Sequence, residues 1–547
     1  MSSSQRQPNI LFILVDQERY FGEYPKELEI PGRRRLMDMG VTFTNHYISS
    51  SVCSPSRSVI YTGQHMPTAG VFDNANIPFV PSLTTNLPTI GTMMRQLGYY
   101  TAYKGKWHLA SELEPDPSRD HNYANDMEKY GFSDWNPDGD VLGDPWDGFI
   151  RDNGTVAGAL QWLRTKGLQL GDEGKPWLLS VDLVNPHDIM YFNTDVPGEK
   201  VHDSGALMME LRRAPDTPTY KQTYEGVVPD NWTQALDEDG RPALHNESME
   251  ATAHAIGRIP LEMERWQRFN DYYLNCMKEV DRKIDRLVAE VDDLGLLDQT
   301  VIIFTSDHGE MGGAHGMRSK MANAYEETVH VPLVIYTPGG AAGASCSAIT
   351  SHVDIAPTLL GLSGASPSAV EGIAQGLPGK DFSELASNPK GATDSSARSG
   401  LLFAYSMVLT LDSDFLANMV EMQKQGKDPA EIKASGVKPD LTKRGFMRTY
   451  FDGRYKFSRC FAPIQHNQPG TADDLYDWND VELFDLAEDP KEMTNLAAQG
   501  KDNRRLVDEL SGKLNHLIST EIGAADDGRY LPKVPGMSWA VTEFKNV

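Results

Sequence analysis

The residues best suited to chemistry surround a cysteine at position 53. The segment Cys53–Arg57 has the sequence CSPSR, and an apolar stretch after it ends at Gly63. Ser54 suits a helix cap, Pro55 the first helical position and Gly63 the end of a helix. We therefore expect a helix that begins beside Cys53, where free backbone amides and the helix dipole favour anions. The alternative for a lone cysteine is a buried structural residue at a strand–helix corner.

Two pairs of polar residues come at the ends of apolar runs. Asp16 and Gln17 end one run, and Asp307 and His308 end another. Oxygen ligands suit Ca²⁺, whereas an imidazole nitrogen suits Mn²⁺ or Zn²⁺ better. Taken alone, each pair fits either turn residues or metal ligands.

Two histidines and a lysine also lie in short polar motifs after apolar runs. Lys106 and His108 belong to GKWH, and His187 belongs to NPHD. A lone lysine is commonly a solvated surface charge, but Lys106 lies in the GKWH motif at the end of the short run Thr101–Tyr103. Imidazole titrates near neutrality, so both histidines are candidates for proton transfer.

These residues require a framework, and the apolar runs predict it. Continuous apolar runs are typical of strands buried on both faces of a parallel sheet. A long amphipathic helix is expected over Leu261–Val291, from apolar positions three and four residues apart. Strands that alternate with helices indicate an α/β fold, a large mostly parallel sheet sandwiched by helices, with ligands at the carboxyl ends of the strands. The expected strands are Asn9–Val15, Trp177–Val184, Thr300–Thr305 and Val331–Tyr336.

A smaller unit is expected after a Gly/Ser/Thr/Asp-rich stretch that begins near Asn388. We predict a catalytic α/β domain over residues 1–390 and a C-terminal α+β domain with an extended tail over 391–547. Its expected elements are the strands Leu401–Tyr405, Phe446–Phe451, Tyr455–Arg459 and Glu482–Leu486 and the helix Asn503–Ile518. Within the first domain, Ser111–Ile150 and His202–Pro260 look like insertions.

The composition argues against nucleic-acid-binding, membrane-bound and disulfide-rich proteins. The 547 residues carry a formal net charge of −26, which disfavours nucleic acid and anionic membranes as partners. Four cysteines do not make a disulfide scaffold, and no apolar run is long enough to span a membrane. The first residues lack the order of a signal peptide, so we expect a cytoplasmic protein.

The motifs together resemble the type I sulfatases of the alkaline phosphatase superfamily. Within that family the chain resembles the branch that contains bacterial arylsulfatases, choline-sulfatases and phosphonate monoester hydrolases. Six blocks occur in the family's order: PNILFILVDQ, CSPSRSVIYTGQ, GKWH, NPHD, SDHGEMGGAHG and ELFDLAEDPKEMTNLA. Each block is weak evidence alone, but six in order are specific and cover most of the chain.

The resemblance implies how the nucleophile and the metal are built. A formylglycine-generating enzyme oxidises Cys53 to formylglycine, and the hydrated aldehyde attacks a small-molecule sulfate ester. A sulfo-enzyme intermediate follows, from which sulfate is expelled by C–O cleavage. Asp16, Gln17, Asp307 and His308, with the modified Cys53, hold one divalent metal ion. Many sulfatases have Asp-Asp and Asp-Asn at these positions, so Gln17 and His308 leave the choice open between Ca²⁺, the family's usual ion, and Mn²⁺.

The resemblance also implies the roles of the charged residues. Arg57 braces the nucleophile and the metal ligands. Lys106 and Lys320 bind the sulfate group, where fixed cations offset the developing negative charge. His108 helps to deprotonate the hydrate, and His187 with Lys320 faces the leaving-group oxygen.

Other residues have weaker assignments. Asn74 lies where some bacterial relatives place a substrate-contacting asparagine, whereas we expect a structural role for His315. Trp135 and Trp146, in the acidic segment Ser111–Ile150, suit either a cationic group such as choline or an ordinary solvated loop, which is our expectation.

Two rival functions stay open. A phosphonate monoester or phosphodiester hydrolase would share this site, but that subgroup tends to replace Lys106 and His108, so we favour a sulfatase with side activity toward phosphoesters. A non-catalytic anion-binding protein would keep Cys53 as a thiol. The tail after Ile522 exposes apolar residues unless it is covered, so we expect it to join subunits of a homo-oligomer. The alternative is a tail that lies across its own subunit.

Overall fold

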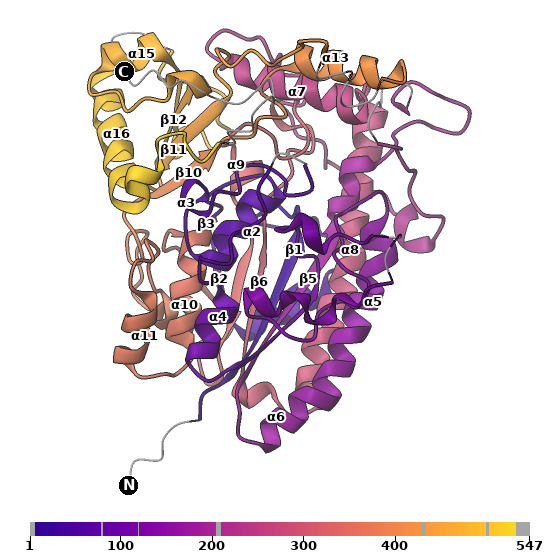
Figure 1. Cartoon of the computed structure of the whole chain (residues 1–547), viewed down its shortest axis with the longest axis vertical. Coiled ribbons are helices and arrows are strands. Elements are labelled where there is room, and N and C mark those ends of the chain that lie inside the picture. Colours follow the sequence, from indigo (N-terminus) through magenta and orange to yellow (C-terminus); the bar gives the residue numbers. More distant parts are fainter. Residues whose placement is uncertain are drawn as a thin grey trace.

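The structure is a computed structural model of the chain. It describes residues 6–77, 80–116, 118, 120–203, 209–427, 431, 434–498 and 503–531. A seven-stranded sheet forms the larger body, and a four-stranded sheet forms a smaller one beside it (Figure 1). The expected α/β sandwich with a smaller α+β unit is therefore confirmed. The C-terminal tail assigned to subunit contacts begins after Ile522. Its first part, residues 523–531, packs on its own chain, where Asp526 pairs with Arg448 and Leu531 is buried in the core. Residues 532–547 lie outside the described residues, so the prediction of subunit contacts stays open for them.

The large sheet is mostly parallel, with the order β4-β5-β1-β6-β7-β2-β8. Strands β4, β5, β1 and β6 run parallel, whereas β7 is antiparallel to β6 and β2 is antiparallel to β7. The three runs that end in polar motifs are β1, β5 and β6, as predicted, and the fourth run forms β7. The bounds are β1 Asn9–Asp16, β2 Val41–Phe43, β4 Tyr100–Gly105, β5 Trp177–Pro186, β6 Thr300–Ser306, β7 Leu333–Tyr336 and β8 Ala344–Cys346.

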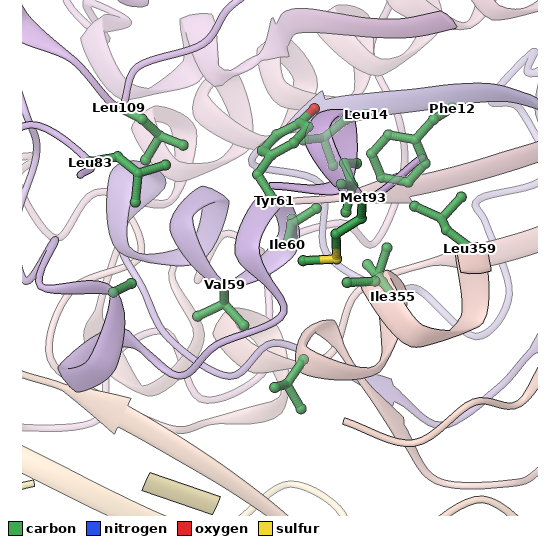
Figure 2. Packing of buried hydrophobic residues seen from close by; sticks show 14 of the residues in the cluster. Phe12, Leu14, Val59, Ile60, Tyr61, Leu83, Met93, Leu109, Ile355 and Leu359 are labelled. Carbon is green, nitrogen blue, oxygen red and sulfur yellow. The ribbon is translucent and has the colours of Figure 1, made fainter. Parts of the chain in front are cut away.

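Strand β1 is buried on both faces, which explains its continuous apolar sequence. Ile10, Phe12 and Leu14 point to one face and pack there against other buried side chains, among them Ile60 and Leu359 (Figure 2). The alternate residues of β1 face the opposite layer. Each successive side chain of a strand points to the other face, so both layers need apolar partners.

Helices cover both faces of the sheet (Figure 1). The first layer holds α1 Pro31–Met39, α5 Asp147–Trp162 and the long α8 Met263–Asp293, which matches the predicted amphipathic helix. The second layer holds α2 Cys53–Thr62, α4 Ile90–Gln96 and α10 Ile355–Leu362. Within the described residues, no helix combines the length and the apolar character that crossing a bilayer requires.

Several local predictions were wrong. Helix α2 begins at Cys53 with Val52 as its cap, and this cap makes no side-chain hydrogen bond. Ser54 is therefore inside the helix, where its hydroxyl donates to the carbonyl of His108. Gly63 does end the helix, with a φ of 64°. The segment 202–260 contains a helix, α7 Ala243–Ile256, which the sequence pattern did not indicate.

The smaller body is an antiparallel sheet, and a helix near the end of the described chain packs on it. Its strands are β10 Leu401–Tyr405, β11 Phe446–Phe451, β12 Tyr455–Phe461 and β13 Asn479–Asp485. Helix α16 Arg504–Leu517 packs Val507, Leu510 and Leu514 onto them. The domain boundary near residue 390 stays a prediction.

Shorter elements complete the described chain. The helices are α3 Met66–Ala69, α6 Leu168–Asp172, α9 Glu326–Val329, α11 Pro367–Ala374, α12 Ser383–Ser387, α13 Ser413–Lys424 and α15 Ala472–Trp478. Strands β3 His46–Tyr47 and β9 Thr350–Ser351 form a two-stranded sheet.

The two bodies meet directly before the cysteine motif. The amide of Ala404 in β10 donates to the carbonyl of Ser49 at 2.9 Å. The Ser50 hydroxyl donates to the carbonyl of Ala404 at 2.7 Å. The C-terminal sheet therefore supports the chain that leads into α2.

Candidate active site

The carboxyl ends of four parallel strands, which carry polar residues, meet at one edge of the sheet. Val15 of β1 lies opposite Ser306 of β6, and Gly105 of β4 lies opposite Asp182 of β5. The residues just beyond these strand ends therefore share one edge of the sheet. Helix α2 begins at the same edge and brings Cys53 to it.

The cysteine lies within a cluster of metal-ligand types. Ligand atoms of Asp16, Cys53, Asp307 and His308 lie within 4.8 Å of one another, and all four residues are buried. Cys53 Sγ is 3.3 Å from His308 Nε2 and 3.8 Å from Asp16 Oδ1. Both Asp16 Oδ1 and Asp307 Oδ1 are 3.6 Å from His308 Nε2.

This donor set fits a divalent cation. His308 Nδ1 is 3.1 Å from the carbonyl of Gly309, so it carries the hydrogen and leaves the lone pair of Nε2 facing the carboxylates. Burial and the neighbouring Asp16 raise the pKa of Asp307 to about 7. A cation between these groups would relieve that repulsion.

Gln17 adjoins this cluster and is held by two further side chains. Its Nε2 donates to Glu310 Oε2 at 2.5 Å, and its Oε1 accepts a hydrogen bond from Lys320 Nζ. Its backbone amide donates to Asp307 Oδ1 at 3.1 Å. Gln17 and Lys320 therefore contact each other beside the cluster.

Arg57, which lies within α2, binds three carboxylates at the site. Its Nε donates to Asp307 Oδ2 at 2.9 Å and its Nη1 to Asp182 Oδ2 at 3.0 Å. Its Nη2 is 3.4 Å from Asp16 Oδ2. The side chain is fully buried; burial disfavours its charge, but the three carboxylates raise its pKa well above the ordinary value. Arg57 is thus a permanent cation of the site.

Lys106 and the two motif histidines surround the same space. Lys106 Nζ is 2.7 Å from Asp16 Oδ2. Burial opposes the charge of Asp16, but Lys106 and the other nearby cationic groups hold its pKa well below the usual range. Burial, followed by Lys106 for His108 and by Lys320 for His187, lowers the pKa of both histidines well below the ordinary value. Both imidazoles are therefore neutral in the ligand-free protein.

Two nitrogen atoms of this group are buried without a hydrogen bond. Over the residues that the structure describes, Nδ1 of His108 and Nδ1 of His187 have no hydrogen-bond partner. Buried polar atoms are rarely left unpaired. An oxyanion or its bound water would supply the missing partner.

Of the residues with weaker assignments, one lies at the site and the others do not contribute to it. The Asn74 side chain accepts a hydrogen bond from the Ser54 amide at 3.3 Å, so it lies at the start of α2. His315 is outside the cluster and stacks on Tyr325, as its expected structural role implies. Trp135 is buried, with its indole N–H bonded to the carbonyl of Gly105, so it offers no face to a cation. Trp146 already lies beneath Arg212.

Four residues of the site were not predicted. Asp182 accepts hydrogen bonds from Arg57 and Tyr61, and Glu310 orients Gln17. Asp140 binds the backbone of His108, and Asn76 contacts the ring of His108 at 3.2 Å. An acid inside the apolar run Trp177–Val184 was a readable signal for Asp182. No comparable signal marked the other three.

The sequence of the chain is similar to sequences of known proteins. The family model described as Sulfatase matches residues 8–365. Choline-sulfatase of Rhizobium meliloti strain 1021 is 28% identical over 386 residues, which cover 66% of this chain and 68% of that protein.

Two solved structures share the fold. A protein solved in complex with its substrate D-glucosamine-2-N,6-O-disulfate superposes with a TM-score of 0.64 at 22% identity, covering 95% of this chain and 99% of that one. Phosphonate monoester hydrolase of Silicibacter pomeroyi has a TM-score of 0.64 at 19% identity, with 95% and 97% covered.

Proposed function

The chain belongs to the sulfatase family of sulfuric ester hydrolases, and from this premise we propose that it hydrolyses sulfate monoesters to an alcohol and inorganic sulfate. The nucleophile is a formylglycine hydrate derived from Cys53. The observation that carries the proposal is a set of buried nitrogen groups beside the cluster. It consists of Lys106 Nζ, next to Asp16, and the Nδ1 atoms of His108 and His187, which form no hydrogen bond within the described part of the chain.

The cationic residues bind and orient the sulfate group. Lys106 Nζ lies beside Asp16 and Lys320 Nζ beside Gln17, so both ammonium groups can bind oxygens of the sulfate group. Fixed cations in a buried site stabilise charge that develops at the transition state, without reorganisation of solvent. Arg57 holds Asp16 and Asp307 in place by charge-assisted hydrogen bonds.

The two histidines donate and accept protons during the reaction. Both are neutral before substrate binds, since burial lowers their pKa values. An anionic sulfate raises the pKa of each ring toward neutrality, because a nearby negative charge favours the imidazolium. His187 then protonates the leaving alcohol, and His108 takes a proton from the hydrate.

A divalent cation completes the site. Asp16, Asp307, His308 and the oxygen of Gln17 would hold it, and when bound it supplies Lewis-acid activation of a sulfate oxygen. Ca²⁺ is our first assignment, and Mn²⁺ is the alternative that the nitrogen of His308 favours. Asn74 would contact the substrate beside Cys53.

The second candidate function is hydrolysis of phosphonate monoesters or phosphodiesters at the same site. The fold shared with a phosphonate monoester hydrolase favours it. We rank it second because both Lys106 and His108 face the reaction space. We also propose side activity toward phosphoesters, maturation by a formylglycine-generating enzyme, a cytoplasmic location and a homo-oligomeric state.

A substrate panel separates the two functions. We expect kcat/KM for aryl and alkyl sulfates to exceed that for phosphonates and phosphodiesters of the same alcohols. We expect Lys106→Ala and His108→Ala to lower kcat/KM for sulfates by about 10²–10³, the usual cost of losing a group that stabilises transition-state charge. A preference of the wild type for phosphonate monoesters over every sulfate would promote the second function.

A further inference from the structure

The segment Asp140–Phe149 crosses the active site between two of its motifs. The Asp140 carboxylate accepts hydrogen bonds from the backbone amides of Trp107 at 2.8 Å and His108 at 2.7 Å. The Asp188 carboxylate accepts hydrogen bonds from the amides of Gly148 and Phe149, each at 2.9 Å. Both carboxylates are buried. The first end of the segment is thus fixed to the GKWH motif and the second to the NPHD motif.

The middle of the segment lies directly on the catalytic side chains. A Cβ placed on Gly143 would lie 3.0 Å from Lys106 Nζ and 3.1 Å from His187 Cε1. The φ of Gly143 is +91°, which side chains rarely allow. The Asp147 carboxylate accepts hydrogen bonds from the amides of Gly143 and Asp144 and keeps this turn closed.

Packing must therefore set the place of the His187 ring. Its Nδ1 forms no hydrogen bond with any of the described residues. Lys106 has a long flexible stem, and the carboxylate of Asp16 attracts its ammonium from one side. The backbone at Gly143 closes the space beside both groups.

We propose that Gly143 is a positioning residue, and that the segment Asp140–Phe149 is a fixed wall that aligns Lys106 with His187. The inference rests on the proposed function of this site and adds a part to it. A side chain at position 143 pushes the ammonium and the imidazole away from the sulfate group. Displacements of a few tenths of an ångström to one ångström are enough to lower rates strongly.

The chain offers a matched control. Gly98 has a φ of +90°, and a Cβ there would meet no atom within 4 Å. Substitution at Gly98 therefore strains the backbone as at Gly143 but displaces no neighbour. We would compare Gly143→Ala and Gly143→Leu with Gly98→Ala and Gly98→Leu.

We expect all four variants to lower Tm, whereas only those at position 143 lower kcat/KM, by about 10-fold for alanine and at least about 100-fold for leucine. Titration with inorganic sulfate gives a second readout, and we expect weaker binding only in the Gly143 variants. Equal kcat/KM and equal sulfate affinity for Gly143→Ala and Gly98→Ala overturn the inference. A wild type that prefers phosphonates contradicts the proposed function instead, and the same comparison then tests Gly143 with that substrate.

Discussion

Arg57 contacts three buried carboxylates, so the negative charge at the site exceeds the positive charge that this residue supplies. One guanidinium cannot neutralise Asp16, Asp182 and Asp307 together, and Lys106 adds one more positive charge. The raised pKa of Asp307, near 7, reflects burial and its closeness to Asp16. With these two cations against three carboxylates one negative charge remains, and a divalent cation would offset it. We therefore expect the proposed ligand residues to bind such a cation with or without substrate.

Removal of one ligand tests this directly. We expect Asp307→Ala to lose its bound metal and its activity, measured by elemental analysis of the purified protein. Asp298→Ala is the control, because Asp298 is exposed just before β6, at the opposite end of the same strand. Wild-type protein that is active without a stoichiometric metal would contradict the assignment, and the element found decides between Ca²⁺ and Mn²⁺.

The ligand residues could be placed from the sequence because of where they stand. Asp16 ends β1 and Asp307 directly follows β6, its parallel neighbour, so their closeness follows from topology. Gln17's partner Glu310 could not be found in this way. It reaches Gln17 across a loop, and such a contact depends on packing that no local pattern records.

At the scale of elements, α16 shows how the smaller sheet is stabilised. Leu510 is fully buried against the sheet, whereas Leu506 of the same helix is only partly buried. Their substitution therefore changes the buried area by different amounts in one helix.

We expect Leu510→Ala to lower the free energy of unfolding by about 2–5 kcal/mol, the usual cost of a leucine-sized cavity. Leu506→Ala should cost less, because less of its surface is buried. Urea unfolding followed by fluorescence and by circular dichroism measures both. Equal losses for the two variants would show that α16 does not pack as described.

Helices and strands could be predicted from the sequence where a single physical requirement determined the residue pattern. Strands β1, β5 and β6 were predicted because burial on both faces demands unbroken apolar sequence. Helix α7 was missed because it buries His245, Ser248 and Thr252 beside its apolar residues, which blurs the periodicity. The start of α2 was misplaced because its cap uses no side chain.

At the scale of the whole molecule, an ionic bridge joins distant parts of the chain. Arg398 binds the Asp354 carboxylate at 2.7 Å and lies 3.4 Å from Glu521. Glu521 also accepts a hydrogen bond from His65, which follows α2, at 2.7 Å. Burial opposes the charge of Glu521, but the hydrogen bond from His65 and the charge of Arg398 lower its pKa.

The direction of this pKa shift fixes how stability depends on pH. A carboxylate whose pKa is lowered on folding stabilises the protein above its unfolded pKa, which is about 4.3 for glutamate. This contribution disappears as the pH falls through the folded pKa. We expect Glu521→Gln to lower Tm at pH 7. We also expect it to reduce the loss of Tm between about pH 5 and about pH 3, the range that brackets the unfolded pKa of glutamate and extends below it.

Glu384→Gln serves as the control, since Glu384 is exposed on α12. Thermal unfolding across this pH range measures both variants. A Glu521→Gln curve parallel to that of the wild type would contradict the bridge.

The central claim, sulfate ester hydrolysis by a formylglycine made from Cys53, is tested most directly by one correlation. Preparations that differ in maturation should be analysed by mass spectrometry of the peptide that contains residue 53, with sulfatase kcat measured on each. The account predicts that kcat rises in proportion to the aldehyde fraction and extrapolates to zero without it. Full activity in protein whose Cys53 is entirely thiol would contradict it.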